Sequence, residues 1–179
     1  MSDLKVGSTS IPGLFRVDLV VHADERGSFT ELFQQEKMTE LGLPALDPVQ
    51  TNLSVNNQRG ITRGIHAEPW NKFITPVKGE AFVAIVDLRA DNFGQVETFE
   101  LSFGQAVFVP KGCGNSYQTL SDEVYYLYNV DAHWQAGMTY PSIYPFDPDL
   151  GIAWPVPEAE AIMSDKDRQN PKFSEIKPL

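Results

Sequence analysis

The stretch from Ala81 to Val130, AFVAIVDLRADNFGQVETFELSFGQAVFVPKGCGNSYQTLSDEVYYLYNV, decides the fold of this chain. It contains four short runs rich in apolar, β-branched and aromatic residues, which we expect to be strands: Ala81–Arg89, Val96–Phe103, Ala106–Pro110 and Val124–Val130. Turn residues separate these runs, as at Gly94, Gly104 and Gly112. Many short strands at spacings of roughly 8 to 12 residues are typical of a β-sandwich or barrel.

The same pattern continues towards the N-terminus. The segment Phe15–His22 alternates, and Ser28–Phe33 follows the turn sequence DERG. Helix signals are few: Gln35–Leu43 predicts one short helix, and Pro157–Ser164 predicts one or two further turns. Because strands dominate, we predict an all-β, double-sheet jelly roll with short flanking helices and a pocket between the sheets.

Length and composition limit the class of protein. A chain of 179 residues fits a single domain over positions 1–179, and its 42% hydrophobic and 21% charged residues are ordinary for a globular protein. It has neither an apolar run of the roughly 20 residues needed to span a bilayer nor a secretory signal, so we expect a cytoplasmic protein without a membrane partner. A net charge of −10 argues against a nucleic-acid partner. The lone Cys113 excludes an intrachain disulfide and a cysteine zinc site, and we expect it to pack in the interior.

Polar chemistry is densest in Gln50–Lys72, QTNLSVNNQRGITRGIHAEPWNK, which surrounds His66 with cationic and acidic side chains. Histidine is the side chain best suited to proton transfer near neutral pH. If residues 62–66 are extended, His66 shares a face with Gly64, Arg63 lies on the other face, and Gly64 leaves space for a ligand. The alternative is a structural histidine whose hydrogen bonds are satisfied inside a polar barrel.

Three further segments bear on the role of His66. The other histidines, His22 and His133, have no paired spacing with it, so no metal site is expected. Alternation in Val124–Val130 puts Tyr128 on one face of a strand, where it either packs or delivers a proton. The sequence SDKD, which contains Asp167, is either a solvated charge cluster or the source of a carboxylate that fixes the tautomer of a histidine.

Together these motifs resemble the dTDP-4-dehydrorhamnose 3,5-epimerase family from Phe15 to Phe173. ERGSFTELF is similar to the family's Arg-Gly-x-Phe-x-Glu segment, and QTNLS with GITRGIH is similar to its Gln-x-Asn-x-Ser and Arg-Gly-x-His signature. FVAIVDLR, DPDLGIAWP and SDKD follow in the family's order. The resemblance implies a cupin-type jelly roll and a homodimer that needs no metal and no organic cofactor.

The resemblance also implies a reaction and its residues. The substrate would be a dTDP-4-keto-6-deoxy sugar, epimerised at C3 and C5 by proton abstraction and return through an enolate. Among the catalytic residues, His66 matches the base, Asp167 its paired carboxylate, Tyr128 the acid on the opposite face of the sugar, and Lys72 the lysine near the keto oxygen. Substrate-binding positions are implied at Arg26, Phe29, Glu31, Gln50, Asn52, Arg63, Asn115, Trp134 and Lys166.

The chain departs from the family's pattern at several positions. Asn115 stands where the family has a second histidine, and Val83 stands where it often has an aspartate. Glu68 replaces a glutamine and Tyr140 a glutamate. These departures keep two alternatives open: an epimerase that inverts a single carbon of a related nucleotide keto sugar, and a catalytically silent cupin that binds sugar nucleotides.

Overall fold

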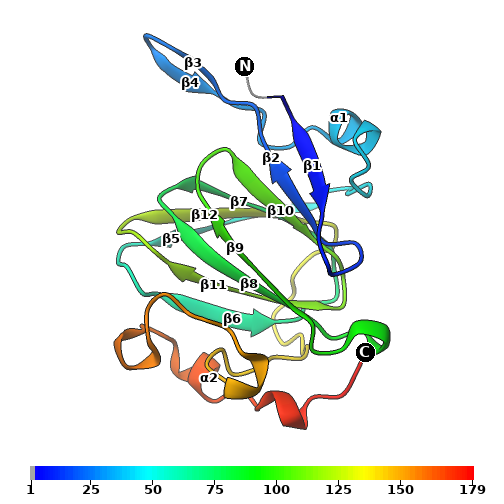
Figure 1. Ribbon diagram of the computed structural model, residues 1–179, viewed down its shortest axis with the longest axis vertical. Helices are drawn as coiled ribbons and strands as arrows, with labels where there is room; N and C mark the ends of the chain where they lie inside the picture. Colours follow the sequence, from blue (N-terminus) through cyan, green and yellow to red (C-terminus); the bar gives the residue numbers. More distant parts are fainter. Residues whose placement is uncertain (1–2) are drawn as a thin grey trace.

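The computed structural model describes residues 3–179, and its architecture is a sandwich of two antiparallel sheets (Figure 1). In spatial order, the six-stranded sheet contains β1 (Lys5–Ser8), β2 (Phe15–Asp18), β10 (Gln105–Val109), β7 (Lys72–Lys78), β12 (Val124–Val130) and β5 (Gln50–Asn56). The four-stranded sheet contains β6 (Thr62–His66), β11 (Cys113–Thr119), β8 (Ala81–Asp87) and β9 (Val96–Leu101). This arrangement confirms the predicted double-sheet jelly roll.

The apolar run of β8 is explained by burial on both faces of the four-stranded sheet. Val83 and Ile85 pack in the core between the sheets, together with Ile74 of β7. On the outer face, Phe82 contacts the ring of Trp154, with 5.4 Å between the ring centroids. A strand covered on both faces has no need of polar residues at alternate positions, and β8 has none before Asp87.

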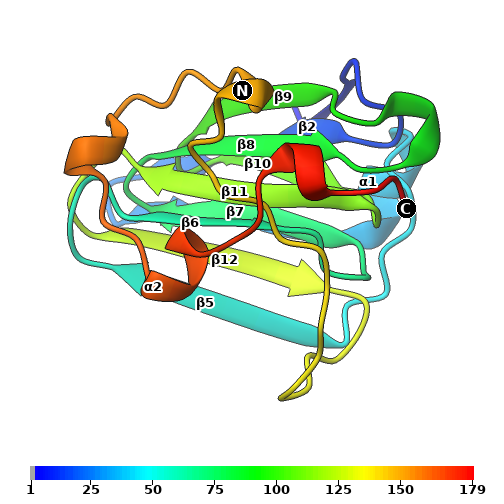
Figure 2. The ribbon, with the colours of Figure 1, turned by 90° about the horizontal axis from the view of Figure 1, so that it is seen from below.

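The C-terminal part of the chain forms the cover on that outer face (Figure 2). Ile143 exchanges two backbone hydrogen bonds with Ile65 of β6, and the backbone N–H of Leu179 donates to Leu88. Within this cover lies α2 (Asp165–Arg168), whose first turn is capped by the side chain of Ser164. The sequence prediction missed this helix, because a single turn is too short to show helical periodicity.

The other helical segments are also short. The helix α1 (Gln35–Glu40) confirms the predicted element and ends before its predicted boundary at Leu43. Short 3₁₀ helices occur at Ala90–Asn92, Pro148–Leu150, Glu158–Glu160 and Phe173–Glu175. The third of these lies within the predicted segment Pro157–Ser164. Within residues 3–179, no helix is both long and apolar enough to cross a membrane.

Among the strands that the sequence prediction missed, which include β5 and β7, Cys113–Thr119 is the one whose composition points most strongly away from a strand. Its glycine, asparagine and serine are turn formers, so the start of this segment reads as part of a turn. In the structure it is β11, a central strand paired with β8 on one side and β6 on the other. Pairing on both edges outweighs the weak local preference for a strand. Cys113 at its start is buried, as expected.

The predicted strands near the N-terminus are interrupted. Phe15–His22 divides into β2, which ends at Asp18, and the start of β3 (His22–Asp24). The strand β3 pairs with β4 (Gly27–Phe29) in a two-stranded hairpin that projects from the body of the sandwich (Figure 1). Ser28–Phe33 is therefore not one continuous strand.

Candidate active site

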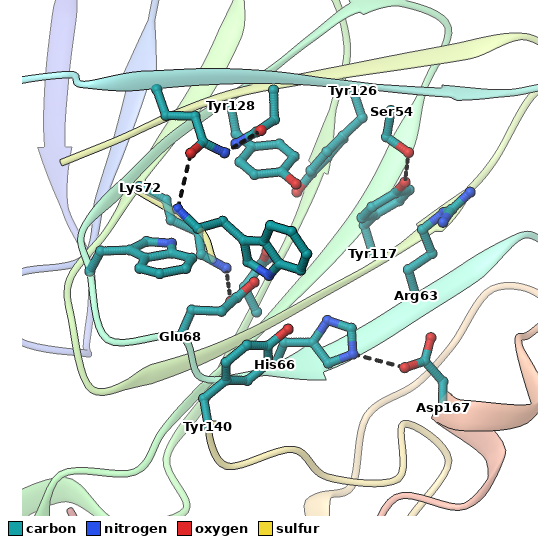
Figure 3. Close-up of a pocket in the computed structure, with 15 residues that line it drawn as sticks. Ser54, Arg63, His66, Glu68, Lys72, Tyr117, Tyr126, Tyr128, Tyr140 and Asp167 are labelled. Carbon is teal, nitrogen blue, oxygen red and sulfur yellow. Dashed lines mark hydrogen bonds and ion pairs between the residues drawn. The ribbon is translucent and has the colours of Figure 1, made fainter. Parts of the chain in front are cut away.

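A cavity of about 330 Å³ lies between the two sheets. Its lining comes from both sheets and from the C-terminal cover: Gln50, Asn52, Ser54, Arg63, His66, Glu68, Trp70, Lys72, Asn115, Tyr117, Tyr126, Tyr128, Trp134, Tyr140 and Asp167. Figure 3 shows Tyr126 and Tyr128 on one wall and His66 with Asp167 on the opposite wall. Several titratable groups in an interior cavity mark it as the candidate site of chemistry.

His66 and Asp167 form a hydrogen-bonded pair at this cavity. The Nε2 atom of His66 lies 2.8 Å from the Oδ1 atom of Asp167, whose side chain is 7% exposed. The Ser164 cap positions α2, because its hydroxyl accepts a hydrogen bond from the backbone N–H of Asp167. Burial raises the pKa of the Asp167 carboxyl, but the hydrogen bonds and the charge of His66 outweigh burial and lower it overall. A charged carboxylate therefore holds the imidazole.

Tyr128 lies across the cavity from His66, on β12 of the six-stranded sheet (Figure 3). Its neighbours two residues away along the strand, Tyr126 and Val130, are buried, as the alternation predicted. Burial, and then the charge of Glu68, raise the pKa of Tyr128 to about 12. The phenol is therefore protonated throughout the neutral range and can act as a proton donor.

Lys72 and Glu68 form an ion pair in the same cavity. Their side chains are 5% and 13% exposed, so both charges are largely removed from water. The resemblance implies that Lys72 lies near the keto oxygen, and the sequence gives no sign of its pairing with Glu68. A lysine has three N–H donors, so Lys72 can serve Glu68 and still donate to a second oxygen.

A bulge in β6 brings Arg63 and His66 to the same cavity. Asn115 of β11 pairs with His66 and Tyr117 pairs with Arg63, so three steps along β6 match two steps along β11. The extra residue breaks the alternation of side chains. The prediction that Arg63 and His66 point to opposite faces is therefore wrong, since both line the cavity.

Gly64 makes this bulge without providing space for a ligand. Its φ is +118°, and a Cβ atom added there would lie 2.6 Å from the backbone oxygen of Asn115. The predicted space for a ligand beside Gly64 is occupied by the backbone of β11. Glycine is needed here for its conformation and for the close approach of the two strands.

Most of the predicted substrate-binding residues lie at the cavity. Gln50 donates to Asn52 at 2.7 Å and accepts from the backbone N–H of Trp134 at 3.0 Å. This chain of contacts ties the loop after β12 to the cavity end of β5. Lys166 does not line the cavity, but its Nζ atom lies 5.8 Å from the ring centre of Tyr140, which does.

The three remaining predicted binding residues lie away from the cavity within this chain. Arg26 pairs with Asp24 in the β3–β4 hairpin, and Phe29 of that hairpin is 67% exposed. Glu31 pairs with Lys37 of α1. Within the described chain these residues do not join His66, so their role in substrate binding stays a prediction.

The cavity also contains residues that were not predicted as site residues from the sequence: Ser54, Glu68, Trp70, Tyr117, Tyr126 and Tyr140. Alternation along β12 was sufficient to find Tyr126, since it lies two residues from Tyr128. Tyr117 was hidden because β11 was not recognised as a strand. No periodic signal marks Trp70, which lies in the loop between β6 and β7. Among residues 3–179, no cluster of three or more histidine, cysteine or carboxylate side chains is arranged to hold a metal ion.

Comparison with known proteins agrees with the motifs. The family model described as dTDP-4-dehydrorhamnose 3,5-epimerase matches residues 8–175. A protein from Streptococcus pyogenes serotype M6, described as "Protein RmlC homolog", is 39% identical over 177 residues, which are 94% of this chain and 89% of that protein. A dTDP-4-dehydro-6-deoxyglucose 3-epimerase from Streptomyces bikiniensis is 30% identical over 178 residues, 95% of this chain and 89% of that protein.

A solved structure extends the agreement to three dimensions. RmlC from Streptococcus suis, in complex with dTDP-D-xylose, matches with a TM-score of 0.93 and 36% sequence identity. The match covers 99% of this chain and 95% of that one. The chain therefore belongs to the dTDP-4-dehydrorhamnose 3,5-epimerase family, a family of isomerases.

Proposed function

We propose that the protein epimerises a dTDP-4-keto-6-deoxy sugar at C3 and C5, converting dTDP-4-keto-6-deoxyglucose to dTDP-4-keto-L-rhamnose. The observation that carries this proposal is the pair of His66 and Asp167 on one wall of the cavity, opposite Tyr128 on the other wall. Inverting a carbon by proton transfer needs a base on one face and an acid on the other face. The cavity offers both.

His66 is the proposed base. With Nε2–H donating to Asp167, the proton-free Nδ1 atom can accept a proton from carbon. The C4 ketone makes that proton acidic, because the electron pair left by the broken C–H bond is delocalised onto the C4 oxygen as an enolate. The carboxylate of Asp167 then stabilises the imidazolium that forms.

Lys72 is the proposed donor to the enolate oxygen. Its ammonium group is buried in the cavity wall, where a preplaced donor stabilises developing negative charge more strongly than in water. Glu68 neutralises part of the positive charge of Lys72. Stabilisation of the enolate oxygen therefore depends more on a directed N–H hydrogen bond from Lys72 than on its net charge.

Tyr128 is the proposed acid. Its O–H bond breaks as a new C–H bond forms on the opposite face of the carbon, and the enolate collapses to the ketone. Proton exchange with solvent afterwards returns Tyr128 to the phenol and His66 to the neutral imidazole. The cycle therefore leaves the enzyme unchanged and the carbon inverted.

A second candidate is inversion of one carbon only. The Streptomyces bikiniensis relative is described as a 3-epimerase, and Asn115 lies at the cavity wall of this chain, where the resemblance to the family implies a histidine. Both candidates use the same base, acid and enolate, so they differ only in which hydrogens are exchanged.

Deuterium labelling distinguishes these candidates. The wild-type protein is incubated with dTDP-4-keto-6-deoxyglucose in D₂O, and NMR locates the deuterium. We expect label at both C3 and C5, with inversion at both carbons. Label at one carbon supports the second candidate, and absence of label contradicts an epimerase acting on this sugar.

We also propose that the protein is a homodimer. Val49, Leu53 and Val55 lie exposed on or beside the edge strand β5, at 44%, 53% and 56% exposure. A two-stranded hairpin is only marginally stable alone, and β3–β4 projects from the body with Phe29 exposed. A second copy that covers these surfaces would bury apolar area, including the exposed ring of Phe29, and would lie against Arg26. The cytoplasmic location stays a prediction.

A further inference from the structure

Two buried polar atoms in the cavity wall have no partner in the protein. In the part of the chain that the structure describes, the buried side-chain atoms without a hydrogen bond are Thr30 Oγ1, Trp70 Nε1 and Tyr126 Oη. The last two belong to residues that line the cavity. Buried polar groups are almost always hydrogen-bonded, because leaving one unpaired is costly. Two such atoms in one cavity point to polar atoms of a ligand.

Tyr126 is held rigidly beside the proposed acid. It is 1% exposed and stacks on Tyr117, with ring centroids 4.0 Å apart and ring planes 18° apart. The ring of Tyr128 lies 6.4 Å away on the same face of β12. Figure 3 shows Tyr126 and Tyr128 side by side on the wall that faces His66. Tyr126 therefore belongs to the cavity wall next to the proposed acid.

The neighbouring Tyr117, in contrast, has a fully hydrogen-bonded hydroxyl in the same cavity. Tyr117 donates to Ser54 at 2.9 Å and contacts Asn56 at 3.2 Å. Tyr126 has no such pair. Burial raises the pKa of its hydroxyl well above the usual value, and the nearby Asn115 side chain acts in the opposite direction. No hydrogen bond of normal geometry joins Tyr126 and Asn115, so the phenol keeps its proton as a free donor.

Trp70 presents a comparable donor from the loop between β6 and β7. The residue is 5% exposed, and the fold fixes its backbone, because its N–H donates to the carbonyl of Glu68 at 2.9 Å. An indole N–H can only donate, so it needs an acceptor. Among the described residues, no acceptor lies within hydrogen-bonding distance of Trp70 Nε1. An oxygen atom of a bound ligand can supply that acceptor.

We propose that Trp70 Nε1 and Tyr126 Oη are further substrate-binding groups, which donate hydrogen bonds to oxygen atoms of the sugar ring. This inference rests on the proposed function, which puts the sugar between His66 and Tyr128. The sugar, rather than the nucleotide, is assigned to these donors because they lie beside Tyr128 and the Glu68–Lys72 pair. Both residues are buried, so their side chains lose little conformational freedom when the ligand binds, which favours selective binding.

The test compares binding of dTDP with binding of dTDP-glucose, which has a C4 hydroxyl and is not epimerised. Isothermal titration calorimetry is applied to the wild type, Tyr126→Phe and Trp70→Phe. We expect each substitution to weaken the binding of dTDP-glucose about 10-fold, which is the effect of one lost hydrogen bond. The affinity for dTDP should be unchanged. The melting temperature of Tyr126→Phe should equal or exceed that of the wild type, because the change removes an unpaired buried hydroxyl.

Matched controls separate binding from packing. Tyr125→Phe makes the same change on the opposite face of β12, and Trp154→Phe removes an indole N–H that donates to Pro145 at 2.8 Å. Both controls should bind dTDP-glucose like the wild type, and Trp154→Phe should lower the melting temperature.

The outcomes are distinguishable from failure of the proposed function. Wild-type affinity for dTDP-glucose in a variant overturns the inference for that residue, and so does an equal loss of affinity for dTDP and dTDP-glucose. If the wild type binds neither ligand, the proposed function itself fails. If the wild type epimerises the keto sugar while both variants bind normally, only the present inference fails.

Discussion

His66 depends on a carboxylate that lies 101 positions away in the sequence. The residue type of His66 and its crowded neighbourhood were visible in the sequence, and they left a structural role as a real alternative. The partnership with Asp167 was implied only by resemblance to a family. Local patterns do not encode such a contact, because it depends on the C-terminal cover folding back across β6.

Asp167→Asn tests the contribution of this carboxylate to the reaction. Asparagine can still accept from Nε2–H, but it does not neutralise the imidazolium, so we expect kcat to fall by about 10²- to 10⁴-fold. Steady-state kinetics measure the effect, with Asp165→Asn on the exposed side of the same helix as the control. An Asp167→Asn enzyme with wild-type kcat would show that the pair is structural.

The raised pKa of Tyr128 predicts how the reaction depends on pH. The neutral phenol is the donor, and its pKa of about 12 keeps it protonated until the solution becomes strongly alkaline. We therefore expect kcat to remain level between about pH 8 and pH 10, with less than a few per cent of Tyr128 ionised at the upper limit. Initial rates across this range provide the measurement, with circular dichroism as the control for folding. A fall to half by about pH 10, with the fold intact, would assign the donor role to a more acidic group.

The bulge in β6 is the element on which the site depends. Regular alternation places Arg63 and His66 on opposite faces, and the sequence analysis predicted that arrangement. The bulge escaped prediction because it requires β11 as the partner strand, and β11 was read in part as a turn. Local composition identified the apolar strands β8, β10 and β12, whereas the polar strand β11 is specified by its two neighbours.

Gly64→Ala tests the bulge directly. A Cβ atom there would meet the backbone of β11 at 2.6 Å and adopt an unfavourable φ, so we expect a loss of at least about 2 kcal/mol in the free energy of unfolding. Gly27→Ala is the matched control, because its φ of +130° is similar and nothing lies within 4 Å of the added atom. Urea denaturation of the two variants gives the comparison. Equal losses would mean that backbone conformation, rather than contact with β11, determines the need for glycine at position 64.

At the scale of the whole molecule, the alternation of strands and turns was enough to predict the jelly roll. It was not enough to predict the hairpin β3–β4 or the covering role of the C-terminal segment. Neither feature contributes to the hydrophobic core between the sheets, and that core is what the apolar pattern encodes. Arg26 and Phe29 of the hairpin were assigned to substrate binding by resemblance, and within one chain they lie apart from the cavity.

The proposed homodimer predicts the effect of a charge on the exposed face of β5. Leu53→Asp places a carboxylate within that apolar surface, so we expect the dimer to dissociate to monomers at micromolar concentration. Size-exclusion chromatography with light scattering reports the mass. Leu41→Asp makes the same change at the end of α1, where the leucine is 48% exposed, and should leave the mass unchanged. A wild-type protein that is monomeric at the same concentration would refute the dimer.

The central claim is that His66 takes a proton from one face of the sugar and Tyr128 returns one to the other. The most direct measurement follows deuterium exchange and inversion separately, by NMR in D₂O, in His66→Asn and Tyr128→Phe. We predict that Tyr128→Phe still exchanges the hydrogen next to the ketone, because His66 can take and return a proton on one face, but that it no longer inverts the carbon. His66→Asn should lose both exchange and inversion. Inversion at the wild-type rate in Tyr128→Phe, or continued exchange in His66→Asn, would contradict the account.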